Sequence, residues 1–368
     1  MPRAPGVIRD SIVGYLTALG KEAGVTEIHG AVARQIGHVQ PSSVRSYLNL
    51  NTPDVFERTS RGHYRLRVQT PSSSRRPEIR PALVEGRASL YQADSFEWLA
   101  RRSPASIHAV VTDPPYGLVE YSEKEQAKLR TGRGGVWRIP PAFDGHQRSP
   151  LPRFTTLNTE DLTELADFFR RLGVLLFKVT VPGANIVVAS NPLLAHIVAS
   201  SMVEARLEVR GSIVRQVMTM RGGDRPKNAH LEFSSVSVMP RSMWEPWLVM
   251  RHPIDGRVQD NLRRWKTGGF RRPSDEKPFG DVIKSSPTPK AERKIAPHPS
   301  LKPQAFLRQI VRAALPLGKG VILDPFAGSG STLAAANAVG YESIGVESDA
   351  QYIHVALGAI KKLQSLVA

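Results

Sequence analysis

The chain has 368 residues, 41% of them hydrophobic and none of them cysteine. This length suits one large domain plus a small one, and the lack of cysteine excludes disulfides, thiolate metal sites and thiol nucleophiles. The formal net charge of +17 is spread along the chain and favours a polyanionic partner, most simply nucleic acid, whereas the lack of a signal peptide or long apolar run argues against membranes and for a cytoplasmic location.

Residues 1–67 are predicted to form a small module. Apolar residues at helical spacing, with helix-starting and helix-ending signals around them, indicate three helices. Two short extended pieces joined at a glycine follow. The helices are expected near 8–19, 26–37 and 40–48, and the extended pieces at 55–58 and 63–66.

This order of elements resembles a winged helix-turn-helix, in which the third helix enters a DNA groove. Arg45 would lie on that helix and Arg61 at the tip of the wing. A small domain that binds protein is the alternative.

Residues 68–86 are expected to be a linker, because Pro, Ser and Arg dominate there without periodicity. From residue 87 onward, strand-like apolar runs alternate with helical patterns, which predicts an α/β fold with a mostly parallel sheet. The strands are expected near 89–92, 109–112, 185–189, 320–323 and 343–346, and the helices near 96–99, 161–178, 306–314 and 331–339.

Two stretches break this pattern. Residues 118–157 lack periodicity, and we expect a loop that is mobile without DNA. Residues 220–296 are rich in Arg, Lys, Pro and Trp, which suits phosphate contact with stacking, although the tryptophans could equally be core residues. The basic residues expected to contact DNA there are Arg221, Arg225, Arg263, Arg264, Lys266, Arg271 and Arg272, and the tryptophans are Trp244, Trp247 and Trp265.

The motif Asp113-Pro114-Pro115-Tyr116 follows an apolar strand. Proline has a fixed φ and no N–H, so the carbonyls around it are held in place and open to donors. Together with a carboxylate and an aromatic face, such a segment can grip a flat ring and polarise its amino nitrogen. A Pro-rich turn without function is the alternative.

A second motif, Asp324-Pro325-Phe326-Ala327-Gly328-Ser329-Gly330, lies between a strand and a helix, and the next strand ends in Glu347. This arrangement is typical of nucleotide and nucleoside sites, in which the last carboxylate accepts ribose hydroxyls. A phosphate-binding P-loop would need a lysine after the last glycine, and a hydride-transfer fingerprint would need a glycine at Leu333. The acid at the loop entrance favours an amine-bearing ligand, which indicates S-adenosylmethionine.

The two motifs in this order resemble the β group of amino-methylating DNA methyltransferases, over about residues 87–360. A third element, His298-Pro299-Ser300-Leu301-Lys302-Pro303, matches the same group. The resemblance implies a circularly permuted, Rossmann-like sheet with a catalytic half at 87–219, a target recognition region at 220–296 and a cofactor half at 297–368.

The resemblance also implies roles for individual residues, and none of them is expected to bind a metal ion. Asp113 and the Pro114 carbonyl would accept hydrogen bonds from the target amino group, with Pro115 in the same turn, and Tyr116 would stack on a base flipped out of double-stranded DNA. The residues expected to bind S-adenosylmethionine are Asp94 (at the adenine amino group, or alternatively a helix N-cap), Thr112, Asp324, Pro325, Phe326, Ala327, Gly328, Ser329, Gly330, Glu347 (at the ribose), and His298 and Lys302 (near the methionine end).

The acid at position 113 favours adenine N6 as the target, because cytosine-N4 methylators of this group more often carry serine there. Methylation of cytosine N4 is the first alternative, and a DNA-binding regulator with a cofactor-sensing domain is the second. RNA as substrate is disfavoured. A homodimer and a cognate restriction endonuclease are left open as partners.

Overall fold

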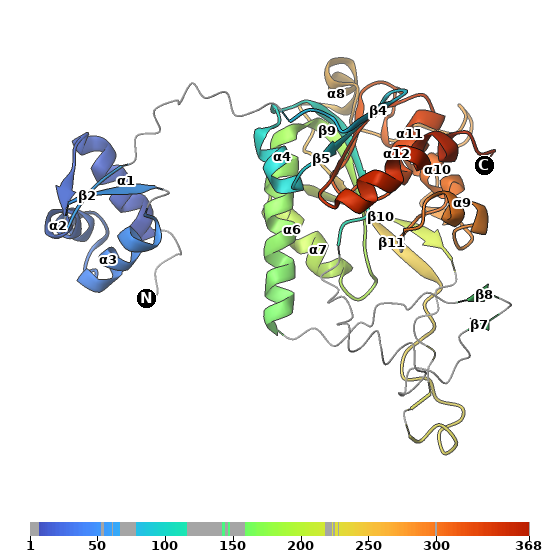
Figure 1. Cartoon of the computed structure of the whole chain (residues 1–368), viewed down its shortest axis with the longest axis horizontal. Helices are drawn as coiled ribbons and strands as arrows, with labels where there is room; N and C mark the ends of the chain where they lie inside the picture. Colours follow the sequence, from blue (N-terminus) through green and yellow to red (C-terminus); the bar gives the residue numbers. More distant parts are fainter. Residues whose placement is uncertain are drawn as a thin grey trace. The chain divides into compact units, whose positions relative to one another are not determined.

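The computed structural model describes residues 7–52, 55–60, 62–66, 79–115, 142–143, 146–147, 159–217, 223, 225–226, 228–298 and 300–367. The chain divides into two compact units, Met1–Glu78 and Ile79–Ala368 (Figure 1). No helix in these ranges is long and apolar enough to span a membrane.

The first unit contains the three expected helices and the expected hairpin. Pro41 occupies the first turn of the third helix, where its missing N–H costs nothing. Apolar side chains from all of these elements, among them Ile12, Ile28, Val44 and Phe56, share one buried core. The elements are α1 (Val7–Leu19), β1 (Ala23–Gly24), α2 (Val25–Ile36), α3 (Pro41–Leu50), β2 (Phe56–Ser60) and β3 (His63–Leu66), and the strands pair antiparallel in the order β1-β3-β2.

The second unit is built on a nine-stranded sheet with the order β12-β10-β11-β9-β6-β13-β14-β5-β4. Only β11 and β4 run antiparallel to their neighbours, so the prediction of a mostly parallel sheet is confirmed. The strands are β4 (Leu83–Glu85), β5 (Ala88–Gln92), β6 (Ile107–Thr112), β9 (Thr180–Ala189), β10 (Glu208–Gln216), β11 (Trp244–Arg251), β12 (Val282–Lys284), β13 (Val321–Asp324) and β14 (Glu342–Glu347), and β7 (Ala142–Phe143) and β8 (His146–Gln147) pair separately.

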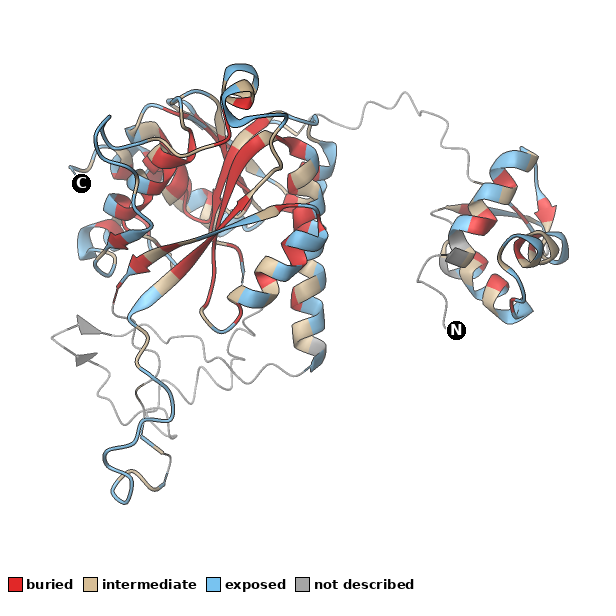
Figure 2. Ribbon diagram, turned by 180° about the vertical axis from the view of Figure 1, so that it is seen from behind, coloured by how far each residue is buried: buried red, intermediate tan, exposed pale blue. Residues whose placement is uncertain are grey.

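Helices cover both faces of this sheet, and the buried strands lie between the two helical layers (Figure 2). Alternate residues of one strand enter different cores: Val110 packs with α4, α6 and α7, whereas Ala109 and Val111 pack with α10 and α11. This is the pattern of a strand buried on both faces. The helices are α4 (Ser95–Arg101), α6 (Thr159–Val179), α7 (Ala195–Glu204), α8 (Val258–Trp265), α9 (Lys290–Ile295), α10 (Gln304–Ala314), α11 (Ser331–Ala338) and α12 (Ala350–Gln364).

One boundary differs from the expectation. Residues 83–85, expected to belong to the linker over 68–86, form β4 and pair with β5 at the end of the sheet. An edge strand of three residues, with Val84 exposed, has too little periodicity to be distinguished from a linker.

Candidate active site

Four acidic residues lie at the carboxyl ends of four neighbouring parallel strands. Asp113 follows β6, Asp324 ends β13, Glu347 ends β14 and Asp94 lies two residues after β5. Since β6, β13, β14 and β5 are adjacent and parallel, their carboxyl ends share one edge of the sheet. The structure therefore brings both sequence motifs to one place, the edge at which open α/β sheets bind their ligands.

Asp324, the first residue of the second motif, is buried, with 3% of its surface exposed. Its Oδ1 accepts hydrogen bonds from Thr112 Oγ1 at 2.7 Å and from the backbone N–H of Phe326 at 3.1 Å. Burial raises the pKa of Asp324 from its ordinary value of 3.8 to about 6, although hydrogen bonds from Thr332, Thr112 and Phe326 oppose the shift. A desolvated carboxylate of this kind gains most from a positively charged ligand.

The glycine loop after Asp324 is shaped by close contacts. Gly328 and Gly330 have φ values of +50° and +80°. A Cβ added at Gly328 would lie 2.9 Å from His298 Nε2, and one at Gly330 would lie 2.6 Å from Ile360 Cγ1. Any other residue would be strained at these φ values and would displace a neighbouring side chain, so both positions favour glycine.

Glu347 and His298 frame this loop. Glu347 Oε2 accepts from the Gly328 N–H at 2.8 Å, and its Oε1 accepts from the Asp349 N–H at 2.8 Å. Burial and the nearby Lys302 lower the pKa of His298, while Asp113 opposes this shift. The hydroxyl of Ser329 is buried and has no hydrogen-bond partner among the residues that the structure describes.

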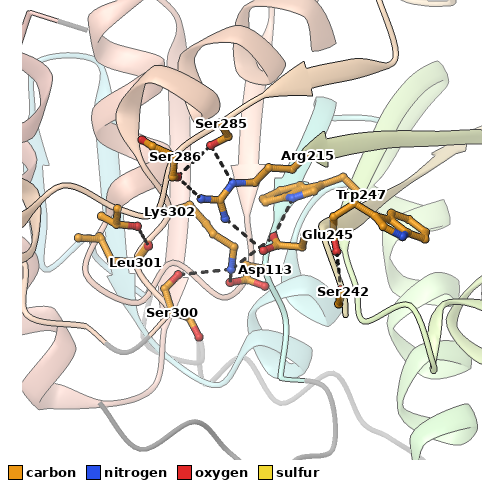
Figure 3. A network of polar contacts seen from close by, with 12 residues as sticks. Asp113, Arg215, Ser242, Glu245, Trp247, Ser285, Ser286, Ser300, Leu301 and Lys302 are labelled. Carbon is orange, nitrogen blue, oxygen red and sulfur yellow. Dashed lines mark hydrogen bonds and ion pairs between the residues drawn. The ribbon is translucent and has the colours of Figure 1, made fainter. Parts of the chain in front are cut away.

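Asp113 is engaged by Lys302, which donates a hydrogen bond from Nζ to Oδ2 (Figure 3). The side chain of Lys302 is only 12% exposed and that of Asp113 only 16%. Lys302 Nζ also lies 3.7 Å from Glu245 Oε1. Burial lowers the pKa of Lys302, but the nearby carboxylates of Asp113 and Glu245 raise it by more. The net shift is upward, so the amine stays charged. Lys302 was expected near the cofactor's methionine end; its amine contacts Asp113 in the structure, and its place beside the cofactor stays a prediction.

Asp94 is the N-cap of α4, because its Oδ1 accepts from the Glu97 N–H at 2.9 Å. This is the alternative considered from the sequence, and contact with adenine stays a prediction. Pro114, Pro325 and Ala327 are buried at the same edge, and Pro115 is exposed. Tyr116 lies outside the described residues, as do Arg61, Arg221, Pro299 and, apart from β7 and β8, the expected mobile loop over 118–157.

Several of the residues expected to contact DNA lie at one edge of the sheet. α8, with Arg263 and Arg264, packs at the amino end of β9, because Asn261 donates to the Pro182 carbonyl at 3.1 Å. This is the edge opposite Asp113. Arg271 lies at the same edge, because its backbone N–H donates to the carbonyl of Ala313, near the end of α10.

Several of these side chains form ion pairs within the protein. Arg263 pairs with Asp260 at 3.1 Å, and Arg264 pairs with Asp255 at 2.8 Å. Lys266 and Arg272 are exposed near them, Arg225 is exposed before the segment 228–243, and Arg45 is exposed on α3. Basic composition thus does not show which edge a residue reaches, and contact with DNA stays a prediction for all of these residues.

The three tryptophans differ in role. Trp247 is a core residue with 1% exposure and packs on Phe306, whereas Trp244 is 40% exposed at the start of β11. Trp265 is half-buried and donates to Asp255 at 3.3 Å.

Sequence reasoning missed Glu245 and Arg215, which lie beside Lys302 on β11 and β10 (Figure 3). Neither belongs to a motif. They meet because the antiparallel register of the two strands places them directly opposite each other, and no sequence signal gives that register.

Comparison with known proteins gives a consistent result. The family model described as DNA methylase, for the N6/N4 group, matches residues 107–358. A type II methyltransferase of Lactococcus lactis subsp. cremoris, M2.LlaDCHI, is 26% identical over 283 residues, covering 77% of this chain and 93% of the relative. M2.DpnII of Streptococcus pneumoniae, also a type II methyltransferase, is 24% identical and covers 75% and 91%.

Among solved structures, the PvuII DNA methyltransferase, described as cytosine-N4-specific, matches with a TM-score of 0.50 and 16% identity, covering 78% of this chain and 91% of that one. At this identity the likeness concerns the fold alone.

Proposed function

The chain belongs to the N6/N4 family of DNA methylases and is an S-adenosylmethionine-dependent DNA methyltransferase, and we propose that its target is the exocyclic N6 of adenine in double-stranded DNA. The observation that supports transfer to an exocyclic amino group is the meeting of Asp113 and Asp324 at one edge of the sheet. One carboxylate faces the target base, and the other belongs to the glycine loop.

The residues present fit the cofactor. Asp324 offers a desolvated carboxylate to an ammonium group, and the glycine loop presents backbone and the unpartnered Ser329 hydroxyl. Glu347 is oriented by backbone N–H groups to accept ribose hydroxyls. His298 would border the methionine end, and Asp94 the adenine. The sulfonium of the bound cofactor supplies an activated methyl group.

At the catalytic strand, Asp113 and the Pro114 carbonyl would accept hydrogen bonds from the two N–H groups of the target amine. These acceptors favour a tetrahedral nitrogen with an available lone pair, and they stabilise the positive charge that develops there. The base must leave the duplex for this contact, and Tyr116 would stack on it. No covalent enzyme intermediate is needed.

The choice of adenine rests on the acid at position 113. Its test is incubation of duplex DNA with the protein and methyl-labelled cofactor, followed by digestion to nucleosides. We expect label in N6-methyladenosine, with Asp113→Ala binding DNA but transferring no methyl group. Label in N4-methylcytosine alone would overturn the choice of base, and no transfer by the wild type would favour the regulatory alternative.

We propose that the segment 228–243 forms the part of the target recognition region that reaches DNA near the site. It connects β10 to β11 at the carboxyl edge of the sheet, and Figure 1 shows it, in yellow, projecting beyond the domain. Leu231 and Val238 are 81% and 65% exposed there. Apolar side chains on such a projection can enter a groove and wedge between base steps.

The double variant Leu231→Ser/Val238→Ser should therefore raise the KM for DNA and leave cofactor affinity unchanged. Val84→Ser, which changes an equally exposed valine on β4, is the matched control. Equal DNA kinetics in the two variants would contradict this role.

Three finer points stay proposals. The first unit would act as a winged helix with Arg45 toward DNA, because it has three helices, a hairpin and an exposed arginine on α3. The order of β6 before β13 in the chain supports a circularly permuted arrangement. The names of the two bacterial relatives support a place in restriction–modification, with a cognate endonuclease and a homodimer as open partners.

A further inference from the structure

We propose that Glu245 and Arg215 are positioning residues for methyl transfer, which act on Asp113 through Lys302. The proposal rests on the methyltransferase activity and on Asp113 as the group that receives the target amine, and it does not depend on which base is methylated. Figure 3 shows the four charged side chains in one connected network.

The network alternates in charge. Asp113 pairs with Lys302, Lys302 Nζ lies 3.7 Å from Glu245 Oε1, and Glu245 Oε2 lies 3.1 Å from Arg215 Nη1. The side chains are between 6% and 19% exposed. Two anions and two cations balance, which is the condition under which such groups tolerate burial.

Glu245 is held from two further directions. Its Oε1 also accepts from Trp247 Nε1 at 2.9 Å, and Trp247 is fixed in the core. Arg215 donates from Nε to Ser285 Oγ at 3.0 Å and from Nη2 to the Ser286 carbonyl at 2.9 Å. A carboxylate fixed in this way gives the flexible Lys302 side chain a defined second anchor.

This arrangement has a consequence for the reaction. Positive charge develops on the target nitrogen, so the ammonium of Lys302 next to Asp113 would oppose it. Glu245 offsets that ammonium, and Asp113 is left with the negative charge that the transition state needs. Glu245 also raises the pKa of Lys302, which keeps the Lys302–Asp113 pair charged at higher pH.

The same two strands supply a matched control. Glu208 and Arg251 face each other in the β10–β11 ladder as Arg215 and Glu245 do, and they pair at 2.6 Å. They lie at the other end of β10, near the amino edge of the sheet. A substitution there removes a cross-strand ion pair without touching Lys302.

The test compares Glu245→Gln with Glu208→Gln in the full-length protein, under conditions in which the wild type methylates DNA. We expect Glu245→Gln to lower kcat by about tenfold to a hundredfold, as misplaced catalytic groups do, with cofactor Kd and the KM for DNA within about twofold. The alkaline limb of its kcat–pH profile should move to lower pH, because Lys302 loses a neighbouring anion. Glu208→Gln should match the wild type in both respects.

A purely structural role for Glu245 would lower stability and leave the pH profile in place, and that result would overturn the proposal, as would an unchanged kcat. Glu245→Asp, which keeps the charge, should recover part of kcat and the original alkaline limb. If Glu245→Gln does not fold, Arg215→Lys provides the test, because it keeps the charge but loses the fork that holds Glu245. A wild-type kcat in that variant would count against positioning.

Discussion

Asp113 and Asp324 stand on neighbouring strands at one edge of the sheet, yet they are stabilised in different ways. Asp113 shares its charge with Lys302 in a balanced network. Asp324 receives hydrogen bonds from hydroxyl and backbone groups, and burial raises its pKa to about 6.

The difference matches the chemistry expected of each group. A carboxylate that must bind a cationic ligand gains affinity if its charge is poorly compensated beforehand, because the ligand then relieves the desolvation. A carboxylate that must accept N–H bonds from a neutral amine needs to be fixed in place, and the contact with Lys302 provides this for Asp113. The carboxylate on the cofactor side is therefore left poorly compensated, whereas Asp113 on the target side is held by Lys302, whose positive charge Glu245 offsets.

Removal of Lys302 should have the largest effect. Lys302→Met leaves Asp113 and Glu245 facing each other without their shared cation, at 16% and 19% exposure. Loss of one partner from a buried pair typically costs about 3 kcal/mol or more, so thermal and denaturant unfolding should show a stability loss of that order, with kcat reduced beyond detection. Lys284→Met, at an exposed position on β12, should change stability by less than about 0.5 kcal/mol. Equal stability of the two variants would contradict the importance of the pair.

On the cofactor side, Asp324→Asn should separate binding from stability. Cofactor Kd, measured by calorimetry, should rise about a hundredfold, as expected for the loss of a buried charge-assisted contact. The protein without cofactor should become more stable at pH 8, by up to about 3 kcal/mol at roughly 1.4 kcal/mol per pKa unit. Asp260→Asn, at a partly exposed position on α8, is the control for both measurements. A destabilised Asp324→Asn protein would show that the buried charge is not costly.

Gly328→Ala should have a smaller effect. The new Cβ would lie 2.9 Å from His298 Nε2, at a φ of +50°. His298 must shift, and we expect cofactor Kd to rise about tenfold, since strain of this kind costs on the order of 1–3 kcal/mol. Gly340→Ala has a comparable φ of +80° with open space around it, so it measures the backbone cost alone. If both variants bind cofactor as the wild type does, the close approach of His298 has no role in binding.

Much of this site was predictable because its acids follow strands with strong apolar patterns. Asp113, Asp324 and Glu347 each end an apolar run, and parallel strands bring such ends together. Asp94 shows the limit, since an acid after a strand and before a helix suits a ligand and an N-cap equally, and the structure shows the cap.

The strands β10, β11 and β12 were not predicted from the sequence, and neither were the contacts between them. The pairing of Arg215 with Glu245 depends on the register across a long connection, which local patterns do not encode. The basic residues near α8 were expected at the DNA because of their charge. β11 runs antiparallel to β9 and ends at the edge opposite Asp113, so α8 follows at that edge, and contact with DNA stays a prediction for these residues. Charge predicts the kind of partner, whereas topology decides which charges can reach it.

The pH dependence gives the smallest and most selective prediction. Only ionised Asp324 attracts a cation, so cofactor Kd should rise about twofold at pH 6 relative to pH 8 and about tenfold at pH 5. Stability without cofactor should move the other way. Because the pKa of Asp324 is raised on folding, its stabilising contribution is complete below pH 3.8 and is lost as the pH rises through about 6. Asp324→Asn should flatten both profiles while His298 still titrates, and a pH dependence of cofactor affinity that survives in this variant would assign it to His298.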